Sequence, residues 1–469
     1  MISAVLNNEK NLVIAAALAL AAVLFIPYIW FGILALICVI SFILLDEKYL
    51  LSASIILFLV MTSDFAASYR NYLNVILIFL LLFLYIRRFG ISIQSFLNFP
   101  KEINYLIALT LFSMLISSIF SSNIIACLIV TLRQLVFFVI VYIFFSFIND
   151  KKMVLNYLNS LIIVSVILGL VIFYDIFSEG LTLFSIQTHS FNQFSGLYSN
   201  PNAVGILLAV TIPIMIALSL IKRNSKSNLK YFYYSLLSFL VVVLLLTDSR
   251  ASIGAVFISV IFILWRLKPR YLKYFLETLA GLAMLIIVVP VLNKYFGIYF
   301  RVERIFENTR YQIWTMSYDI IRHNFLFGVG PDLFWTKIYT YLPVMLGSFE
   351  AHQIWWARSG AAHNFFLYKF AEMGILGLAS AVYLFVVYFK ISFKVEEMTK
   401  QIDKDYYYIS VAVTSIGLGL LGRSFLEATS LISNGWITRD LPFWLVVITA
   451  AYLYKTFFVP NMIENNIND

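Results

Sequence analysis

The chain alternates long apolar stretches with short polar connections over almost its entire length. A helix of about 20 residues crosses a hydrocarbon core of about 30 Å, and apolar stretches close to this length recur throughout. The pattern predicts an all-α polytopic membrane fold with about fourteen transmembrane helices, in a range of about twelve to fourteen. The predicted spans are residues 11–29, 31–45, 50–64, 72–86, 103–120, 123–147, 155–177, 202–221, 231–247, 251–266, 274–292, 363–389, 406–421 and 441–457.

Composition excludes a soluble enzyme. Hydrophobic residues make up 62% of the 469 positions and charged residues 12%, whereas an average soluble domain carries about 25% charged residues. Cys38 and Cys127 lie inside apolar runs without Cys or His neighbours at metal spacing, so we expect neither a disulfide framework nor a zinc site. The net charge of +9 indicates loop topology rather than a nucleic-acid partner.

Basic residues orient the chain in the membrane. Most Lys-rich loops fall on one side of the predicted spans, and we assign that side to the cytoplasm together with both termini. The first apolar run lacks a clear cleavage site, so we expect it to be a retained span. Residues 293–362 form a long, aromatic-rich loop on the opposite, outward side, which predicts a small subdomain of one or two amphipathic helices over the membrane mouth. The expected parts are a bundle at 1–292, the loop subdomain at 293–362 and the final helices at 363–469.

The outward basic residues are mostly arginine, although topology alone requires only positive charge. Arginine is favoured where a planar fork must bind phosphate or carboxylate and stay charged when partly desolvated. The alternative is that these arginines pair with outward carboxylates such as Glu307 and Asp332 and hold the loop together. Outward group transfer also needs an energy-rich donor already in the membrane, and a sugar linked to a lipid diphosphate meets that need. The outward arginines are Arg70, Arg250, Arg301, Arg304, Arg310, Arg322, Arg358, Arg423 and Arg439.

Three residues are the candidates for catalysis. His363 begins an apolar helix just past the outward loop, where its imidazole is placed to take a proton from an acceptor hydroxyl. Gly374 and Gly377 follow at a spacing that permits close helix contact. Arg250 lies in a short polar turn between two spans and is expected at the depth of a lipid diphosphate. Arg310 opens a predicted helix that would place it over the membrane mouth. The alternatives are an interfacial histidine, a flanking anchor and a surface arginine.

Other positions extend this candidate site. Asn202 follows Asn200-Pro201 and is expected to cap the next helix. Arg133 interrupts an apolar run, so we expect it to pair with Glu427 or Asp440 or to line a lipid-phosphate groove. The run from Gly328 to Pro331 lacks the context of a nucleotide loop and is interpreted as a tight turn. The full set of expected substrate contacts is Arg133, Asn202, Arg250, Arg301, Arg304, Arg310, Trp314 and Asn364.

These residues resemble the O-antigen ligase and polymerase superfamily. His363-Asn364, nine residues, Gly374, two residues and Gly377 match the H-N-x9-G-x2-G signature of O-antigen ligases. Arg310 with Trp314, Arg250, and Asn200-Pro201-Asn202 resemble further family motifs, and the similarity covers about residues 190–390. The resemblance implies a membrane-type, GT-C-like glycosyltransferase fold in the bacterial inner membrane with a periplasmic active site. It also implies an inverting enzyme that needs no metal or other cofactor.

By this resemblance the enzyme moves a glycan from undecaprenyl diphosphate to an acceptor hydroxyl of lipid A core. Arg250 and Arg310 would bind the diphosphate, and His363 would activate the acceptor or position the donor. A repeat-unit polymerase that acts on the same carrier stays open, since about fourteen spans favour it slightly. A flippase of the lipid-linked glycan is a third hypothesis, which predicts an internal repeat and polar residues deep within several spans.

Overall fold

A computed structural model describes residues 46–60, 70–90, 99–178, 180, 194–198, 200–222, 229–300, 309–341 and 361–468. Helices joined by turns and bends account for these ranges, which contain no strand, and the predicted all-α class is confirmed. The helices are α4 (Glu47–Val60), α5 (Arg70–Phe89), α6 (Lys101–Ile119), α7 (Ile124–Ser146), α8 (Lys151–Ser178), α10 (Pro201–Lys222), α11 (Leu229–Leu246), α12 (Arg250–Leu267), α13 (Pro269–Val288), α14 (Pro290–Phe300), α15 (Thr309–His323), α16 (Phe334–Tyr341), α18 (Phe365–Ile402), α19 (Lys404–Ser424) and α20 (Ile437–Asn468).

Nine helices in the described part of the chain are long and apolar enough to cross a membrane. Every predicted span from residue 50 onward overlaps a helix, including α4, α11 and α19, which are not among the nine. The first two predicted spans, 11–29 and 31–45, lie outside the described residues. The polytopic membrane character is therefore confirmed, and the total of about fourteen spans stays a prediction.

Two of the predicted spans show how the helix bounds in the structure depart from those expected. The span at 274–292 is divided, because α13 ends at Val288 and Pro290 begins α14; proline has no N–H to continue the helix and clashes with the preceding turn. The span at 363–389 belongs to a longer helix, since α18 continues to Ile402 through a stretch with buried Val395 and Thr399 and charged residues between them. An apolar run predicts which residues lie in the membrane, but it does not predict the residue at which the helix ends.

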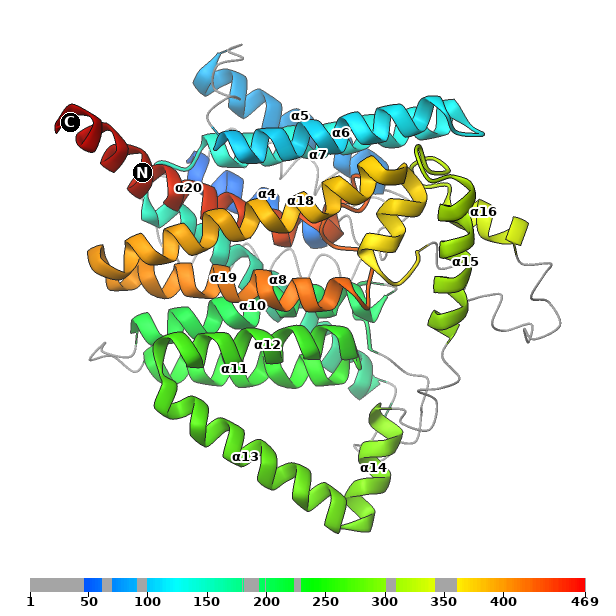
Figure 1. Ribbon diagram of the computed structural model, residues 1–469. Helices are drawn as coiled ribbons and strands as arrows, with labels where there is room; N and C mark the ends of the chain where they lie inside the picture. Colours follow the sequence, from blue (N-terminus) through cyan, green and yellow to red (C-terminus); the bar gives the residue numbers. More distant parts are fainter. Residues whose placement is uncertain are drawn as a thin grey trace.

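Helix α10 is at the centre of the bundle. It packs against α8, α11, α12, α19 and α20, and almost all of its residues from Val204 to Ser219 are buried. Helix α13 is at the periphery: it has no buried residue, and Figure 1 shows it lying below the other long helices. Helices α15 and α16 lie at the end of the bundle where α18 begins, as Figure 1 shows, and both pack against α18. We call this end the His363 end.

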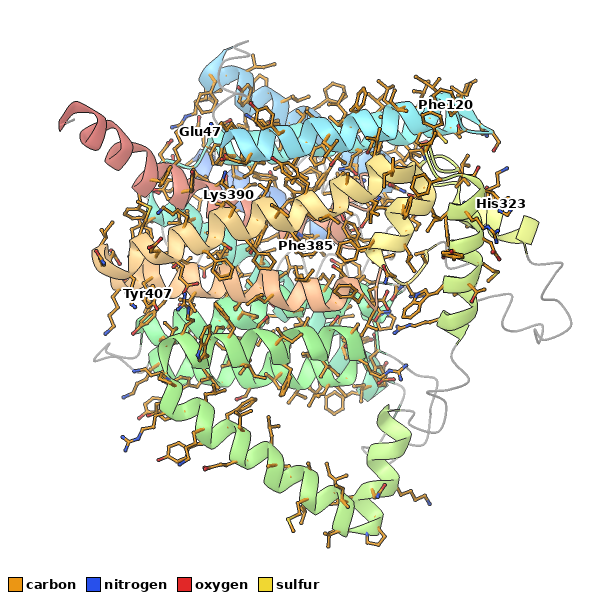
Figure 2. All side chains as sticks on the ribbon, viewed as in Figure 1. Glu47, Phe120, His323, Phe385, Lys390 and Tyr407 are labelled. Atoms are coloured by element: carbon orange, nitrogen blue, oxygen red, sulfur yellow. The ribbon has the colours of Figure 1, made fainter. Side chains whose placement is uncertain are left out.

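The two ends of the bundle differ in their chemistry. At the end opposite His363, lysines and arginines pair with carboxylates of neighbouring helices: Lys151 with Asp403 and Asp405, Lys390 with Glu102, Arg266 with Glu396, and Arg88 with Glu47. Figure 2 places Glu47, Lys390 and Tyr407 toward this end and Phe120 and His323 at the other. These pairs tie the helices together at one end, and the candidate site occupies the other.

Candidate active site

A single buried carboxylate brings together three of the predicted site residues. Glu427 lies in the loop between α19 and α20, and only 5% of its surface is exposed. Its Oε1 accepts hydrogen bonds from Nη2 of Arg310 and from Nδ2 of Asn202, both at 3.1 Å. Its Oε2 lies 3.3 Å from Nδ1 of His363. Residues of α10, α15 and the start of α18, far apart in the sequence, thus converge on one group.

Arg423, in the last turn of α19, is a second arginine close enough to act on the charge of Glu427. Its side chain is buried and donates from Nε to Oγ of Ser252 at 3.2 Å, from Nη1 to the Thr429 carbonyl at 3.1 Å and from Nη2 to the Asn202 carbonyl at 3.3 Å. Ser249 donates to Oδ1 of Asn202 at 2.7 Å and so links the start of α12 to the same network. We call Asn202, Arg310, His363, Arg423 and Glu427 the Glu427 cluster.

The Glu427 cluster carries a surplus of positive charge. Burial raises the pKa of the Glu427 carboxyl, but the hydrogen bond and charge of His363 and the charges of Arg423 and Arg310 outweigh burial and lower the pKa to about 2. The carboxylate is therefore ionised at neutral pH. Two arginines act on this single negative charge: Nη2 of Arg310 lies 3.1 Å from Oε1 of Glu427, and Arg423 belongs to the same buried network. Such an arrangement favours binding of an additional anion.

The backbone at His363 adopts a conformation that few residues accept. His363 has φ of +48°, which costs about 1–3 kcal/mol for a residue with a side chain and persists only where the surroundings enforce it. The other described residues besides glycine with positive φ all lie at the His363 end: Asp248, Asp332, Ser430 and Asn434. Strain of this kind concentrates at functional sites. The structure thus holds the imidazole against Glu427 at an energetic cost.

Asn202 does not cap a helix as expected, whereas Asn364 does. The expected cap of α10 is wrong for Asn202, because Asn200 does this work by accepting from the Asn202 N–H at 2.8 Å, and the Asn202 side chain is left to bridge Ser249 and Glu427. Asn364, an expected substrate contact, caps α18 through Oδ1 to the Leu367 N–H at 3.0 Å. Asn364 therefore fixes the turn that carries His363.

The two glycines after His363 serve a break in the helix rather than helix packing. Gly374 has φ of +64° and interrupts α18, and a Cβ at this position would lie 2.2 Å from the Leu326 carbonyl oxygen. The break exposes the Ala371 and Glu372 carbonyls, which accept the N–H groups of Val329 and Gly330. The tight turn expected at Gly328 to Pro331 lies instead on either side, at residues 325–327 and 331–332, and the segment between these two turns is docked on the break.

Arg133 lies in a different cluster from the one expected. Its Nη2 is 3.7 Å from Oδ2 of Asp332, and its Nε donates to the Asn434 carbonyl at 2.6 Å, so the expected pairing with Glu427 or Asp440 is wrong. The reason is packing: Gly435 lies directly against the Arg133 backbone and leaves room for no side chain. Arg133 is thereby held beside Trp436, at the far end of the loop that begins near Glu427.

The remaining expected contacts are spread around the cluster. Arg250 is exposed at the first position of α12, next to Ser249. Trp314 lies on α15 one turn after Arg310, and its buried Nε1 finds no acceptor among the described residues. His323 is exposed and contacts the carbonyl of Asp319, away from the cluster. Arg301 and Arg304 lie outside the described residues.

Sequence reasoning gave Glu427 and Arg423 no catalytic part. The sequence marks Arg423 only as an outward charge and Glu427 only as a candidate partner for Arg133. Arg423 and Glu427 are four residues apart at the end of a span, and residues at this spacing share one face of a helix. This spacing is the signal in the sequence that could have indicated that the two side chains lie near each other. Nothing local in the sequence indicates that α10, α15 and α18 meet on this carboxylate.

Comparison with known proteins fits this arrangement. No curated protein matches the chain. Residues 234–382 match the family model for O-antigen ligase, a stretch that includes Arg250, Arg310 and His363. The match supports an enzyme of the ligase or polymerase type that acts on a lipid-linked glycan and an acceptor in a membrane. The chain is thus a multi-pass membrane protein that contains, at residues 234–382, a stretch similar to the O-antigen ligase family.

Proposed function

We propose that the protein transfers a glycan from undecaprenyl diphosphate to an acceptor hydroxyl, and that the Glu427 cluster is its active site. The observation that carries the proposal is the gathering of two arginines and a histidine around one buried carboxylate, at a strained turn at the His363 end. The acceptor is lipid A core, in keeping with the ligase signature that begins at His363. By the distribution of lysine and arginine, this end faces the periplasm.

His363 is the proposed general base. With its proton on Nδ1, the imidazole donates to Oε2 of Glu427, and the lone pair on Nε2 is directed away from the carboxylate. Nε2 then takes the proton of the acceptor hydroxyl as the hydroxyl oxygen attacks the anomeric carbon of the donor sugar. Glu427 stabilises the imidazolium that forms. This division of roles parallels the carboxylate and histidine of hydrolase triads.

Arg310 and Arg250 are the proposed ligands of the diphosphate. As the new glycosidic bond forms, the bond from the anomeric carbon to the diphosphate oxygen breaks, and the diphosphate leaves with its negative charge. Attack from the side opposite the leaving group inverts the anomeric centre. Arg310 is in the Glu427 cluster, so it holds the leaving group within the site. Arg250 is exposed beside the cluster, so it holds the leaving group at the rim of the site.

The products of the purified protein test this proposal. The protein in nanodiscs is given an undecaprenyl diphosphate-linked oligosaccharide, with and without lipid A core, and no ATP or metal. Transfer of intact glycan only when the core is present is the expected result. A ladder of longer lipid-linked products without the core would instead assign the polymerase reaction. An absence of both products, with the protein folded, would contradict the proposal.

A further inference from the structure

A buried lysine and a buried glutamate lie on α18 between His363 and the break at Gly374. Lys369 is 1% exposed and Glu372 is fully buried, and Nζ of Lys369 lies 3.9 Å from Oε2 of Glu372. Neither residue belongs to the Glu427 cluster. Such a pair is expensive to bury, and apolar residues of similar size are often at least as stable in the same place. Stability alone therefore does not account for Lys369 and Glu372.

The two carboxylate oxygens of Glu372 bind two different segments of the chain. Oε1 accepts the backbone N–H of Asp332 at 2.7 Å, and Oε2 accepts a hydrogen bond from Nδ2 of Asn434 at 3.2 Å. Asp332 lies between α15 and α16, and Asn434 lies in the loop between α19 and α20. Helix α15 carries Arg310, and the loop carries Glu427. One side chain thus joins the segments that supply two residues of the Glu427 cluster.

The backbone of Glu372 strengthens the first of these connections. Its carbonyl oxygen accepts the N–H of Gly330 at 2.9 Å and the hydroxyl of Ser117, on α6, at 2.7 Å. A Cβ at Gly328 would lie 2.3 Å from the same oxygen, so this close approach requires glycine. The segment after α15 is therefore fixed to α18 through both the main chain and the side chain of Glu372.

Asn434 is held from several sides at the other end of this bridge. Its Oδ1 accepts a hydrogen bond from Nζ of Lys369 at 3.1 Å, and its carbonyl accepts one from Nε of Arg133 at 2.6 Å. Asn434 has φ of +56° and Asp332 has φ of +65°, a backbone that is costly for residues with a side chain. Such strain persists only where the surroundings impose it. Both partners of the Glu372 carboxylate are thus strained residues that the bridge helps to hold.

We propose that Glu372 is a positioning residue of the transfer reaction, with Lys369 as its charge partner, and that it sets the place of Arg310 relative to Glu427. Helix α15 packs against α18, and the segment that follows α15 is fixed by Glu372, so the bridge determines where α15 presents Arg310. A misplacement of about 1 Å near the reacting atoms slows a reaction as much as about 100-fold. This inference rests on the proposed function and adds a residue that acts without touching the substrate.

Two double variants of the full-length protein test the bridge. Lys369→Met with Glu372→Gln and Lys369→Met with Glu372→Leu both remove the two buried charges, so neither leaves a charge without its partner. An amide oxygen still accepts the Asp332 N–H, whereas leucine has no acceptor. Glycan transfer from an undecaprenyl diphosphate-linked oligosaccharide is measured in nanodiscs. The pair with Glu372→Gln should transfer at least about tenfold faster than the pair with Glu372→Leu. Equal rates from folded proteins would overturn the positioning role.

Asn434→Gly tests the other end of the bridge and leaves Lys369 and Glu372 in place. It removes the donor to Oε2, while φ of +56° suits glycine, so the melting temperature should stay close to that of wild type. Transfer should nevertheless be at least about threefold slower than in wild type, because the loop that carries Glu427 is no longer held. A variant that melts and transfers as wild type would contradict the bridge.

A second background separates positioning from a general loss of structure. Arg310→Lys keeps a charge but loses the planar fork of donors. In this background the two double variants should differ less than about threefold, because the fork that the bridge places is already absent. The same factor in both backgrounds would leave Glu372 a structural role only and overturn the proposal. If Arg310→Ala transfers as wild type, the proposed function fails; if it is inactive and the two double variants transfer equally, only this inference fails.

Discussion

Glu427 sets the charge of the candidate site and keeps it constant over the range in which the protein works. Its pKa of about 2 lies below the ordinary value of 4.5, so the ionised form is favoured in the folded protein. The resulting stabilisation is complete above about pH 4.5 and is lost as the pH falls through about 2. Between pH 5 and 9, therefore, Glu427 cannot cause a change in rate.

Glu427→Gln tests this assignment. The amide keeps the size of the side chain but cannot stabilise an imidazolium, so glycan transfer should fall about 100-fold. The acid limb of the pH–rate profile should persist in the variant, because Glu427 does not titrate there. Rates of transfer by wild type and variant between pH 5 and 9 provide the measurement. An acid limb that disappears in the variant would show that the carboxyl itself titrates in this range.

Local sequence motifs predict part of the site, and tertiary packing determines the rest. His363, Arg310 and Asn202 could be identified because each stands in a short polar break next to an apolar run. Their meeting on Glu427 depends on how α10, α15 and the start of α18 pack together, and a single sequence does not fix the buried face of a helix that is as uniformly apolar as α10. Arg133 was misassigned for the same reason.

The broken helix α18 is the element that carries the site. Its first turns, up to Gly374, hold His363 through the Asn364 cap and accept the segment at Gly328 on their free carbonyls. Its longer second part crosses the bundle to Ile402. The position of the helix was predictable from its apolar residues, but the break was not. A glycine in an apolar run looks the same in the sequence whether it allows a neighbouring helix to approach or interrupts its own helix.

Gly374→Ala should destabilise the protein severely. The new Cβ would meet the Leu326 carbonyl at 2.2 Å, and φ of +64° is unfavourable for alanine, so we expect a loss of at least about 2 kcal/mol. Gly254→Ala in α12 is the control, since its Cβ meets nothing within 4 Å and alanine favours a helix. Thermal unfolding of both variants in detergent gives the comparison. Equal melting temperatures would contradict the role of Gly374.

The cap of α18 can be tested separately from the break. Asn364→Ala removes the acceptor for the Leu367 N–H and should cost about 1 kcal/mol, with slower transfer because His363 is no longer held. Asn364→Asp keeps that acceptor and should recover most of the melting temperature. Thermal unfolding and transfer rates are measured on both variants. An alanine variant as stable and active as the aspartate variant would exclude the capping role.

For the whole molecule, the two ends of the bundle have distinct tasks. Ion pairs such as Lys390–Glu102 and Arg266–Glu396 join helices at one end, and the Glu427 cluster occupies the other. The length and apolarity of the helices were sufficient to predict a polytopic all-α fold, because a bilayer imposes both. The arrangement of the helices around α10 was not predictable, since it depends on contacts between distant segments.

The orientation of the bundle gives a prediction at this scale. Ser122, in the turn after α6, is exposed at the His363 end, and Gln401, near the end of α18, is exposed at the opposite end. In intact cells with a permeable outer membrane, a membrane-impermeant maleimide should label Ser122→Cys and spare Gln401→Cys. Cys127 is buried, so the unaltered protein provides the background. The reverse labelling pattern would place the site on the cytoplasmic side.

Transfer by purified His363→Ala and Arg310→Ala in nanodiscs shows whether the Glu427 cluster carries out glycan transfer. The rates are compared with those of wild type and of His323→Ala, a histidine exposed on α15 outside the cluster. We predict that both cluster variants stay folded and lose at least about 99% of the transfer rate, while His323→Ala keeps it. Full transfer by folded His363→Ala and Arg310→Ala would contradict the account.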